Sequence, residues 1–96
     1  MIEFSTNNGV VTVRITGRFD FRCVKQFQAG LTYSDVRWVV DLAEVEYVDS
    51  AALGLLLLLR EHAARDAHQV TLRAARGQPR EVLMMAKFDR MFAFEA

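Results

Sequence analysis

The sequence predicts an α/β domain with a small mixed β-sheet, in which an antiparallel opening hairpin precedes parallel strands and helices pack mainly on one face. Three observations support this fold class. Two runs rich in branched and aromatic residues flank Asn8-Gly9, and an Asn-Gly pair in this position is a strong hairpin signal. The segment Val36–Leu42 is strongly apolar and β-branched, which is typical of a central strand. Helical and strand patterns then alternate, as parallel crossovers require.

The opening hairpin is expected to pair Ile2–Ser5 with Val10–Thr16. Apolar and polar residues alternate in the second of these segments, which indicates a strand with one buried face. Gly17 is expected to break this strand.

Three helices are expected after the hairpin. The first runs from about Phe21 to Gly30, with Asp20 as its candidate N-cap. The second runs from Ser50 to Arg65. The third begins near Pro79, a residue suited to a first helical turn, and continues to about Lys87.

The strands that alternate with these helices complete the predicted sheet. Five of the seven residues of Val36–Leu42 are apolar, which predicts burial on both faces. Val70–Ala74 is expected to form a further strand, and Phe88–Phe94 to pack back as a short irregular strand or a terminal helical turn.

Length and composition are those of a single folded domain spanning residues 1–96. Apolar residues make up 52% and charged residues 25% of the chain, which are ordinary values for a globular protein. No linker, repeat or low-complexity segment interrupts it.

Charge and hydropathy exclude two classes of partner. Twelve basic and twelve acidic side chains cancel, so the footprint of a nucleic-acid binder is missing. Arg73, Arg76 and Arg80 form a local basic group without stacking aromatics, and we interpret them as solvated surface. The longest uncharged apolar stretch, Ala51–Leu59, is far shorter than the roughly 20 residues of a membrane-spanning helix, so no membrane insertion is expected.

A single cysteine, Cys23, allows no disulfide framework and no cysteine metal cluster. The chain also opens without the basic and apolar regions of a secretory signal. Both features favour a cytoplasmic location.

Catalysis is not expected. The glycines are scattered singly, so no phosphate-binding loop is present. His62 and His68 lack the spacing of a metal motif and are interpreted as solvated or capping residues. Ser50 has neither a neighbouring general base nor a Gly-x-Ser-x-Gly elbow. The sequence therefore predicts no enzyme, no cofactor and no metal.

The segment Asp49-Ser50-Ala51-Ala52-Leu53-Gly54 follows the apolar strand and opens the second helix. Ser50 fits the N-cap position, where its oxygen would accept an unpaired backbone N–H. The same position suits a phosphate, because a helix start presents free N–H donors and partial positive charge. An ordinary cap and a phosphorylation site both remain open for Ser50.

This segment resembles the hallmark of the STAS family, named for sulfate transporters and anti-sigma factor antagonists, in which Asp-Ser-Ser/Thr-Gly-Leu-Gly opens a helix. The resemblance is greatest to small bacterial anti-sigma factor antagonists and extends over nearly the whole chain. It implies a STAS-like α/β fold and implies phosphorylation of Ser50 by a partner that is both anti-sigma factor and serine kinase. Ala51 removes the second hydroxyl common in the motif, and Ala52 replaces a glycine, which indicates right-handed backbone angles there.

Carboxylates are expected to gather near Ser50. Asp20 and Asp49 either cap helices or turns or, as the resemblance implies, orient the hydroxyl or the metal bound to a partner's ATP. Asp41 and Glu44 lie at or just after the end of the apolar strand and are expected to converge on the same region.

The leucine run Leu55–Leu59 wraps more than half of a helix, so some of its members must face away from the sheet. Either neighbouring helices cover these leucines, or they form an apolar strip that docks a partner. Leu55 and Leu58 are the expected outward positions.

Together with these residues, the resemblance to the STAS family implies an anti-sigma factor antagonist of a bacterial partner-switching pathway, controlled by reversible phosphorylation of Ser50. Its expected partners are an anti-sigma factor with serine kinase activity and a serine phosphatase, and the chain itself is expected to be a monomer or weak dimer. The alternative is a non-phosphorylated STAS scaffold or a small-ligand-sensing subunit of a larger complex. The expected partner-binding residues are Asp20, Asp49, Ser50, Ala51, Leu53, Gly54, Leu55 and Leu58.

Overall fold

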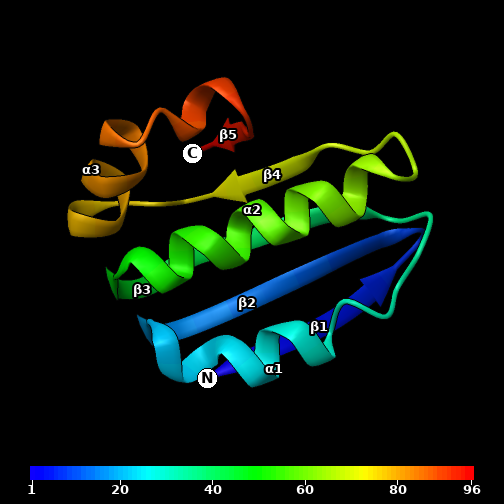
Figure 1. The fold of residues 1–96 in the computed structure, drawn as a ribbon, viewed down its shortest axis with the longest axis horizontal. Coiled ribbons are helices and arrows are strands. Elements are labelled where there is room, and N and C mark those ends of the chain that lie inside the picture. Colours follow the sequence, from blue (N-terminus) through cyan, green and yellow to red (C-terminus); the bar gives the residue numbers. More distant parts are fainter.

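The computed structural model describes residues 1–96 and contains one five-stranded sheet with strand order β1-β2-β3-β4-β5 (Figure 1). β1 and β2 are antiparallel, and the remaining neighbours are parallel, which confirms the predicted mixed sheet. The elements, with 3-10 turns marked η, are β1 (Ile2–Asn7), β2 (Val10–Phe19), η1 (Phe21–Cys23), α1 (Val24–Ala29), β3 (Arg37–Val48), α2 (Ser50–Ala64), β4 (Val70–Arg73), α3 (Gly77–Met85), η2 (Phe88–Arg90) and β5 (Ala93–Glu95).

The opening hairpin is confirmed. Asn7 pairs with Val10, so Asn8 and Gly9 alone form the turn. Their φ angles of 51° and 78° are both positive, as a type I′ turn requires. The Asn-Gly pair therefore sets the register of β1 against β2.

Two strands are longer than predicted. β2 continues past Gly17 to Phe19, and Gly17 takes a φ of 81° at an irregularity in the register instead of ending the strand. β3 continues past Leu42 to Val48, because β2 stays paired with it along this extension. The expected strand break at Gly17 is thus wrong.

The predicted helices are confirmed, with small shifts at their ends. The first begins after Asp20 as the 3-10 turn η1 and continues as α1. α2 starts at Ser50 as predicted, and α3 starts at Gly77, with Pro79 in its first turn. The segment Phe88–Phe94, for which the sequence leaves two forms open, contains the turn η2 and then most of β5.

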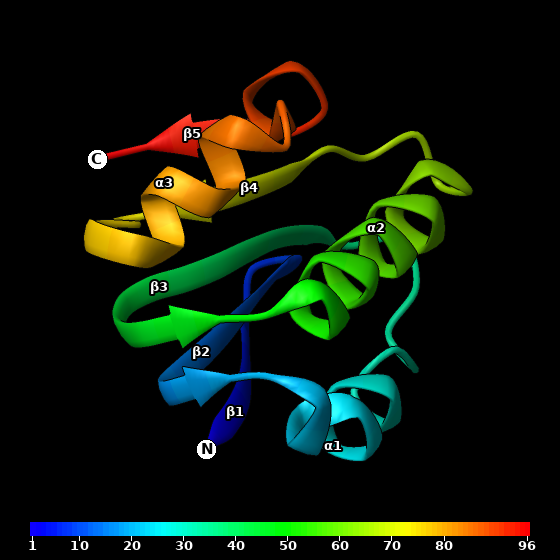
Figure 2. The same cartoon turned by 60° about the vertical axis from the view of Figure 1, so that its left-hand side comes forward.

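Only one face of the sheet is covered by helices (Figure 2). Strand order follows chain order from β2 to β5, so right-handed crossovers carry each helix to the same side. Along β3, Trp38, Val40 and Leu42 are buried, whereas Val39 and Asp41 are partly exposed. The prediction that this strand is buried on both faces is wrong, because no helix covers its second face.

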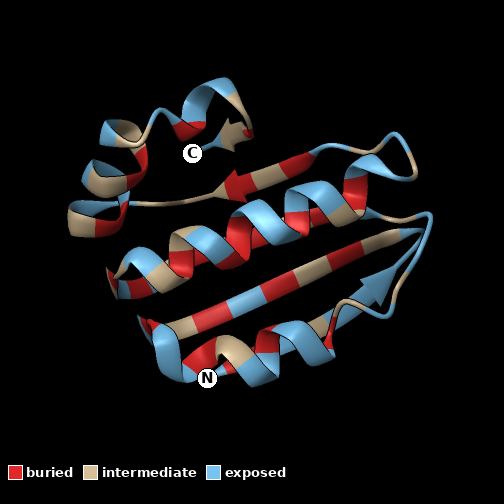
Figure 3. Cartoon of the chain, in the orientation of Figure 1, coloured by how far each residue is buried: buried red, intermediate tan, exposed pale blue.

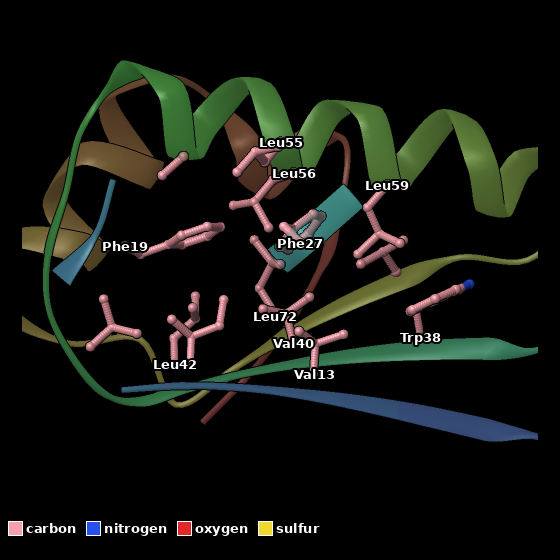
Figure 4. Close-up of a cluster of buried hydrophobic side chains, with 14 of the residues drawn as sticks. Val13, Phe19, Phe27, Trp38, Val40, Leu42, Leu55, Leu56, Leu59 and Leu72 are labelled. Carbon is pink, nitrogen blue, oxygen red and sulfur yellow. The ribbon is translucent and has the colours of Figure 1, made fainter. Parts of the chain in front are cut away.

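The core lies between the sheet and the helices. Leu55, Leu56 and Leu59 of α2 point at the sheet and meet residues such as Phe19 and Trp38 (Figure 4). Along α2 the buried residues recur every three or four positions, which appears as a buried stripe facing the sheet (Figure 3).

The expected outward position of Leu55 is wrong, since only 4% of this residue is exposed. It falls on the stripe that packs on the sheet, three residues after Ala52 and four before Leu59. Leu58 is 37% exposed, which confirms its outward orientation, and its neighbour Leu57 is 38% exposed.

The uncovered face carries a row of alternating charge that crosses every strand. Neighbouring strands place these side chains in register: Glu3, Arg14, Asp41, Arg73 and Glu95. Arg73 and Asp41 form an ion pair of 3.1 Å, so Arg73 is more than the solvated surface that we expected. Burial disfavours the charge of Asp41, but the Ala43 N–H and the Arg73 guanidinium outweigh it and hold the pKa of Asp41 below its ordinary value.

Candidate functional site

The predicted site lies where β2 and β3 end beside each other. The backbone N–H of Asp49, just after β3, donates to the carbonyl of Phe19 at the end of β2, over 3.4 Å. Both strands lead into helical segments at this edge of the sheet, so the starts of η1 and α2 are neighbours.

Asp49 joins these two helical starts. Its Oδ1 accepts the N–H of Ala52 at 3.0 Å and caps α2, and its Oδ2 accepts the N–H of Phe21 at 3.2 Å. The interpretation of Ser50 as the N-cap is therefore wrong. Asp49 has the extended backbone of an N-cap, while Ser50 is already the first residue of the helix.

The Ser50 side chain is left free by this arrangement. Ser50 is exposed, and its hydroxyl makes no hydrogen bond within the chain. It stands in the first turn of α2, where the helix dipole and unpaired N–H groups favour an anion. Ala52 is helical, as the replacement of a glycine indicated.

Asp20 lies next to this pair but has different partners. Only 5% of its side chain is exposed, and Arg22 binds it through two hydrogen bonds of 3.2 and 2.8 Å. Arg18 approaches Asp20 at 3.5 Å, and the Arg22 N–H donates to it at 3.1 Å, which confirms Asp20 as a cap. The hydrogen bonds from Arg22 lower the pKa of Asp20 to about 2.

One exposed face of α2 runs from Ser50 through Gly54 to Leu57 and Leu58, since these positions recur with helical spacing. A Cβ at Gly54 would have no atom within 4 Å, so neither packing nor backbone angles require a glycine there.

The remaining two predicted partner-binding residues of α2 are less exposed. Ala51 is partly buried at the edge of this face, and Leu53 packs against the core. The structure therefore gathers Asp20, Asp49, Ser50 and Gly54 around the start of α2, and leaves Leu55 in the core.

Two residues near Ser50 were not found from the sequence. Phe21 is 67% exposed, and Asp49 binds its backbone N–H. Its exposure could not be predicted, because an aromatic residue at the start of a helix looks the same in sequence whether its side chain is exposed or buried. Gln78 of α3 binds the backbone of Val48 with two hydrogen bonds of 3.0 Å. No local sequence pattern predicts such a contact between residues far apart in the chain.

Other candidate groups lie elsewhere. Glu44 pairs with Arg14 on the neighbouring strand, as Asp41 does with Arg73, so neither hydrogen-bonds at the start of α2. His62 contacts the carbonyl of Tyr33 at 2.6 Å near the other end of α2. No group of three or more His, Cys, Asp and Glu side chains is arranged to hold a metal ion. None of the helices has the length and hydropathy needed to cross a membrane.

Comparison with known proteins agrees with this geometry. A family model described as "Mlab, STAS domain" matches residues 2–93. The chain belongs to the STAS-domain family. A STAS-domain-containing protein of Pseudomonas aeruginosa (strain UCBPP-PA14) is 36% identical over 91 residues, which cover 92% of this STAS domain and 90% of the relative.

Solved structures share the fold of this STAS domain. An anti-sigma factor antagonist (STAS) domain protein from Planctomyces limnophilus has a TM-score of 0.86 at 19% identity, with 99% of this chain and 89% of that chain covered. The Bacillus anti-sigma factor antagonist SpoIIAA, in its unphosphorylated form, has a TM-score of 0.77 at 17% identity, with 100% and 87% covered. At these identities the likeness concerns the fold.

Proposed function

We propose that this STAS domain is an anti-sigma factor antagonist that binds an anti-sigma factor with serine kinase activity and is controlled by phosphorylation of Ser50. A serine phosphatase would restore the unmodified form. The observation that carries the proposal is the exposed, unbonded hydroxyl of Ser50 in the first turn of α2, with the capping function taken by Asp49. Such partners put the site of action in the cytoplasm.

Charge provides the switching mechanism. A phosphoserine carries about −1.5 to −2 charges at neutral pH. On Ser50 it would gain from the dipole and N–H groups of α2, yet it would stand beside the Asp49 carboxylate. A partner that covers this surface would have to desolvate both negative groups, so phosphorylation would weaken docking.

The surface around Ser50 supports the binding half of the proposal. Phe21, whose N–H is bound by Asp49 at the start of α2, and Leu58, one turn after the exposed Gly54, both offer exposed apolar area. A glycine within a helix lowers helix stability by about 1 kcal/mol relative to alanine, and no contact inside this chain requires one. A partner that packs closely on α2 would account for the glycine at this position. We propose the predicted residues as the contact surface, with Leu55 acting only from the core.

The structural relatives support the same class of function. SpoIIAA is described as an anti-sigma factor antagonist, and its fold is known in an unphosphorylated and a phosphorylated form. A phosphorylation switch is thus compatible with this fold.

The proposal is tested by incubating the chain with ATP and the kinases encoded next to its gene, followed by mass spectrometry of the intact protein. Wild type should gain one phosphate and Ser50→Ala none. Because Ser50 is not the cap, Ser50→Ala should change the free energy of unfolding by less than about 0.5 kcal/mol. Phosphate found on Ser34 or Thr71, with Ser50 unmodified, would refute the assignment.

Calorimetry against the same partner tests the switch. Ser50→Ala should bind like wild type, whereas Ser50→Asp should bind more weakly, since a desolvated carboxylate opposes docking. Equal affinities would favour the second candidate function, a non-phosphorylated STAS subunit of a larger complex. The description of the matching family model, "Mlab, STAS domain", supports this candidate. A ligand-sensing role has less support, because only two of the eight residues that line the main hollow, of about 490 Å³, are hydrophobic.

A further inference from the structure

The second half of β3 has a strand neighbour on one side only. β2 pairs with β3 as far as Val48, but β4 pairs only with Trp38–Asp41. Beyond Asp41 the other edge of β3 borders a groove of about 490 Å³, which separates residues 43–46 from the start of α3. The strand that leads to Ser50 therefore lacks the support that a central strand normally has.

Gln78 supplies this support at the last residue of the strand. Its Oε1 accepts the N–H of Val48 at 3.0 Å, and its Nε2 donates to the carbonyl of Val48 at 3.0 Å. One side-chain amide thus gives Val48 the donor and acceptor that a neighbouring strand would give. Gln78 can do so because the adjacent Pro79 is buried in the first turn of α3 and fixes that turn against β3.

We propose that Gln78 is a positioning residue for the Ser50 hydroxyl. Val48 is held by Gln78, and Asp49 is held by Phe19 and, through its side chain, by Phe21 and Ala52. Among these contacts, the one from Gln78 comes from α3. It fixes the position of Val48, the last residue of β3, two residues before Ser50. This inference rests on the proposed phosphorylation of Ser50.

The test uses the full chain with Gln78→Leu, which keeps the bulk of the side chain and removes both hydrogen bonds. The Val48 amide should exchange with solvent about fivefold faster or more, since one net hydrogen bond changes an opening equilibrium by about this factor. Phosphorylation of Ser50 by the cognate kinase should show a kcat reduced severalfold with KM nearly unchanged, because the docking surface is intact while the acceptor is less often in reactive geometry.

Two further variants separate positioning from general stability. Gln78→Glu keeps the acceptor for the Val48 N–H and should restore part of the lost exchange protection and of kcat. Gln69→Leu changes an exposed glutamine between α2 and β4 and should leave both quantities as in wild type.

Unchanged exchange at Val48 in Gln78→Leu, or faster exchange with an unchanged kcat, would overturn the positioning role. Equal reductions of kcat by Gln78→Leu and Gln69→Leu would do the same. Failure of the proposed function has a different signature: the wild-type chain itself would take up no phosphate at Ser50.

Discussion

The carboxylates of Asp20 and Asp49 both cap helical starts, but only one of them has its charge compensated. Asp20 is bound by the guanidinium groups of Arg22 and Arg18. Asp49 accepts only backbone N–H groups and forms no ion pair. A phosphate on Ser50 would therefore be repelled by Asp49 far more than by Asp20. The two residues, which look equivalent in sequence, differ in what they contribute to a switch.

The low pKa of Asp20 predicts a loss of stability in acid. Its folded-state value of about 2 lies below its ordinary value of 3.8, because Arg22 favours the charged form. The resulting stabilisation is fully present above the ordinary value and is lost as the pH falls from there toward 2. Asp20→Asn should thus flatten this part of the pH dependence.

Urea unfolding, followed through the single tryptophan, Trp38, measures this effect. The difference in midpoint between wild type and Asp20→Asn should shrink between pH 4 and pH 2, the range bounded roughly by the two pKa values. Midpoints that stay parallel over this range would contradict the assigned pKa.

The sequence was sufficient to locate the segment that contains the site, but not to predict which residue of that segment caps α2. Asp and Ser are both good N-caps, and which of two adjacent residues takes the role depends on one backbone angle pair. The roles of Phe21 and Gln78 depend on contacts across the fold, for which their local sequence has no signal.

At the scale of elements, α2 combines a buried stripe with a partly apolar exposed face. Leu55, Leu56 and Leu59 lie in the core, while Leu57 and Leu58 are each more than a third exposed. Leu58 also lines a shallow hollow between α1 and α2, together with Leu31 and others, and Leu57 does not. The outward leucines Leu57 and Leu58 are thus not fully covered by neighbouring helices, and docking of a partner on them stays a prediction.

Alanine substitutions should separate these roles. Leu55→Ala should lower the free energy of unfolding by about 2–5 kcal/mol, the usual cost of truncating a buried leucine. Leu58→Ala should cost much less but should weaken partner binding by about 1 kcal/mol or more if it is an anchor, as calorimetry would show. Met85→Ala, which truncates an exposed apolar residue at the end of α3, is the control and should leave affinity unchanged. Equal losses of affinity for Met85→Ala and Leu58→Ala would argue against the exposed face of α2 as the docking surface.

Gly54→Ala should have opposite effects on stability and on binding. It should raise the free energy of unfolding by about 0.5–1 kcal/mol, because alanine favours a helix and its methyl group enters open space. The same methyl group should weaken binding of a partner that approaches the α2 backbone closely. Ala64→Leu adds bulk at another exposed position, near the end of the helix, and should leave affinity unchanged. A stabilised Gly54→Ala variant with wild-type affinity would remove this residue from the contact surface.

The types of most elements could be predicted from sequence, whereas the ends of β2 and β3 could not. The Asn-Gly turn and the helical spacing of α2 are local signals. The extension of β3 beyond Leu42 to Val48 crosses Glu44, a charged residue that normally marks the end of a buried strand. It is tolerated because its side chain is exposed and pairs with Arg14 of the neighbouring strand.

For the molecule as a whole, coverage of a single sheet face separates two surfaces. The helical face carries Ser50 and the apolar residues near it, so the proposed partner contacts all lie on one side. The opposite face is polar and presents β-strands without a covering layer. An exposed sheet face of this kind is a potential surface for self-association.

The row of alternating charge on that face gives it an inherent symmetry. Its order, negative, positive, negative, positive, negative from β1 to β5, is the same in either direction, with Asp41 at its centre. If two copies met face to face about a two-fold axis through this centre, each charge would oppose one of the same sign, whether the axis ran along the strands or across them. The row of alternating charge on one copy would therefore repel the same row on a second copy. Each copy is then free to present its helical face to other proteins.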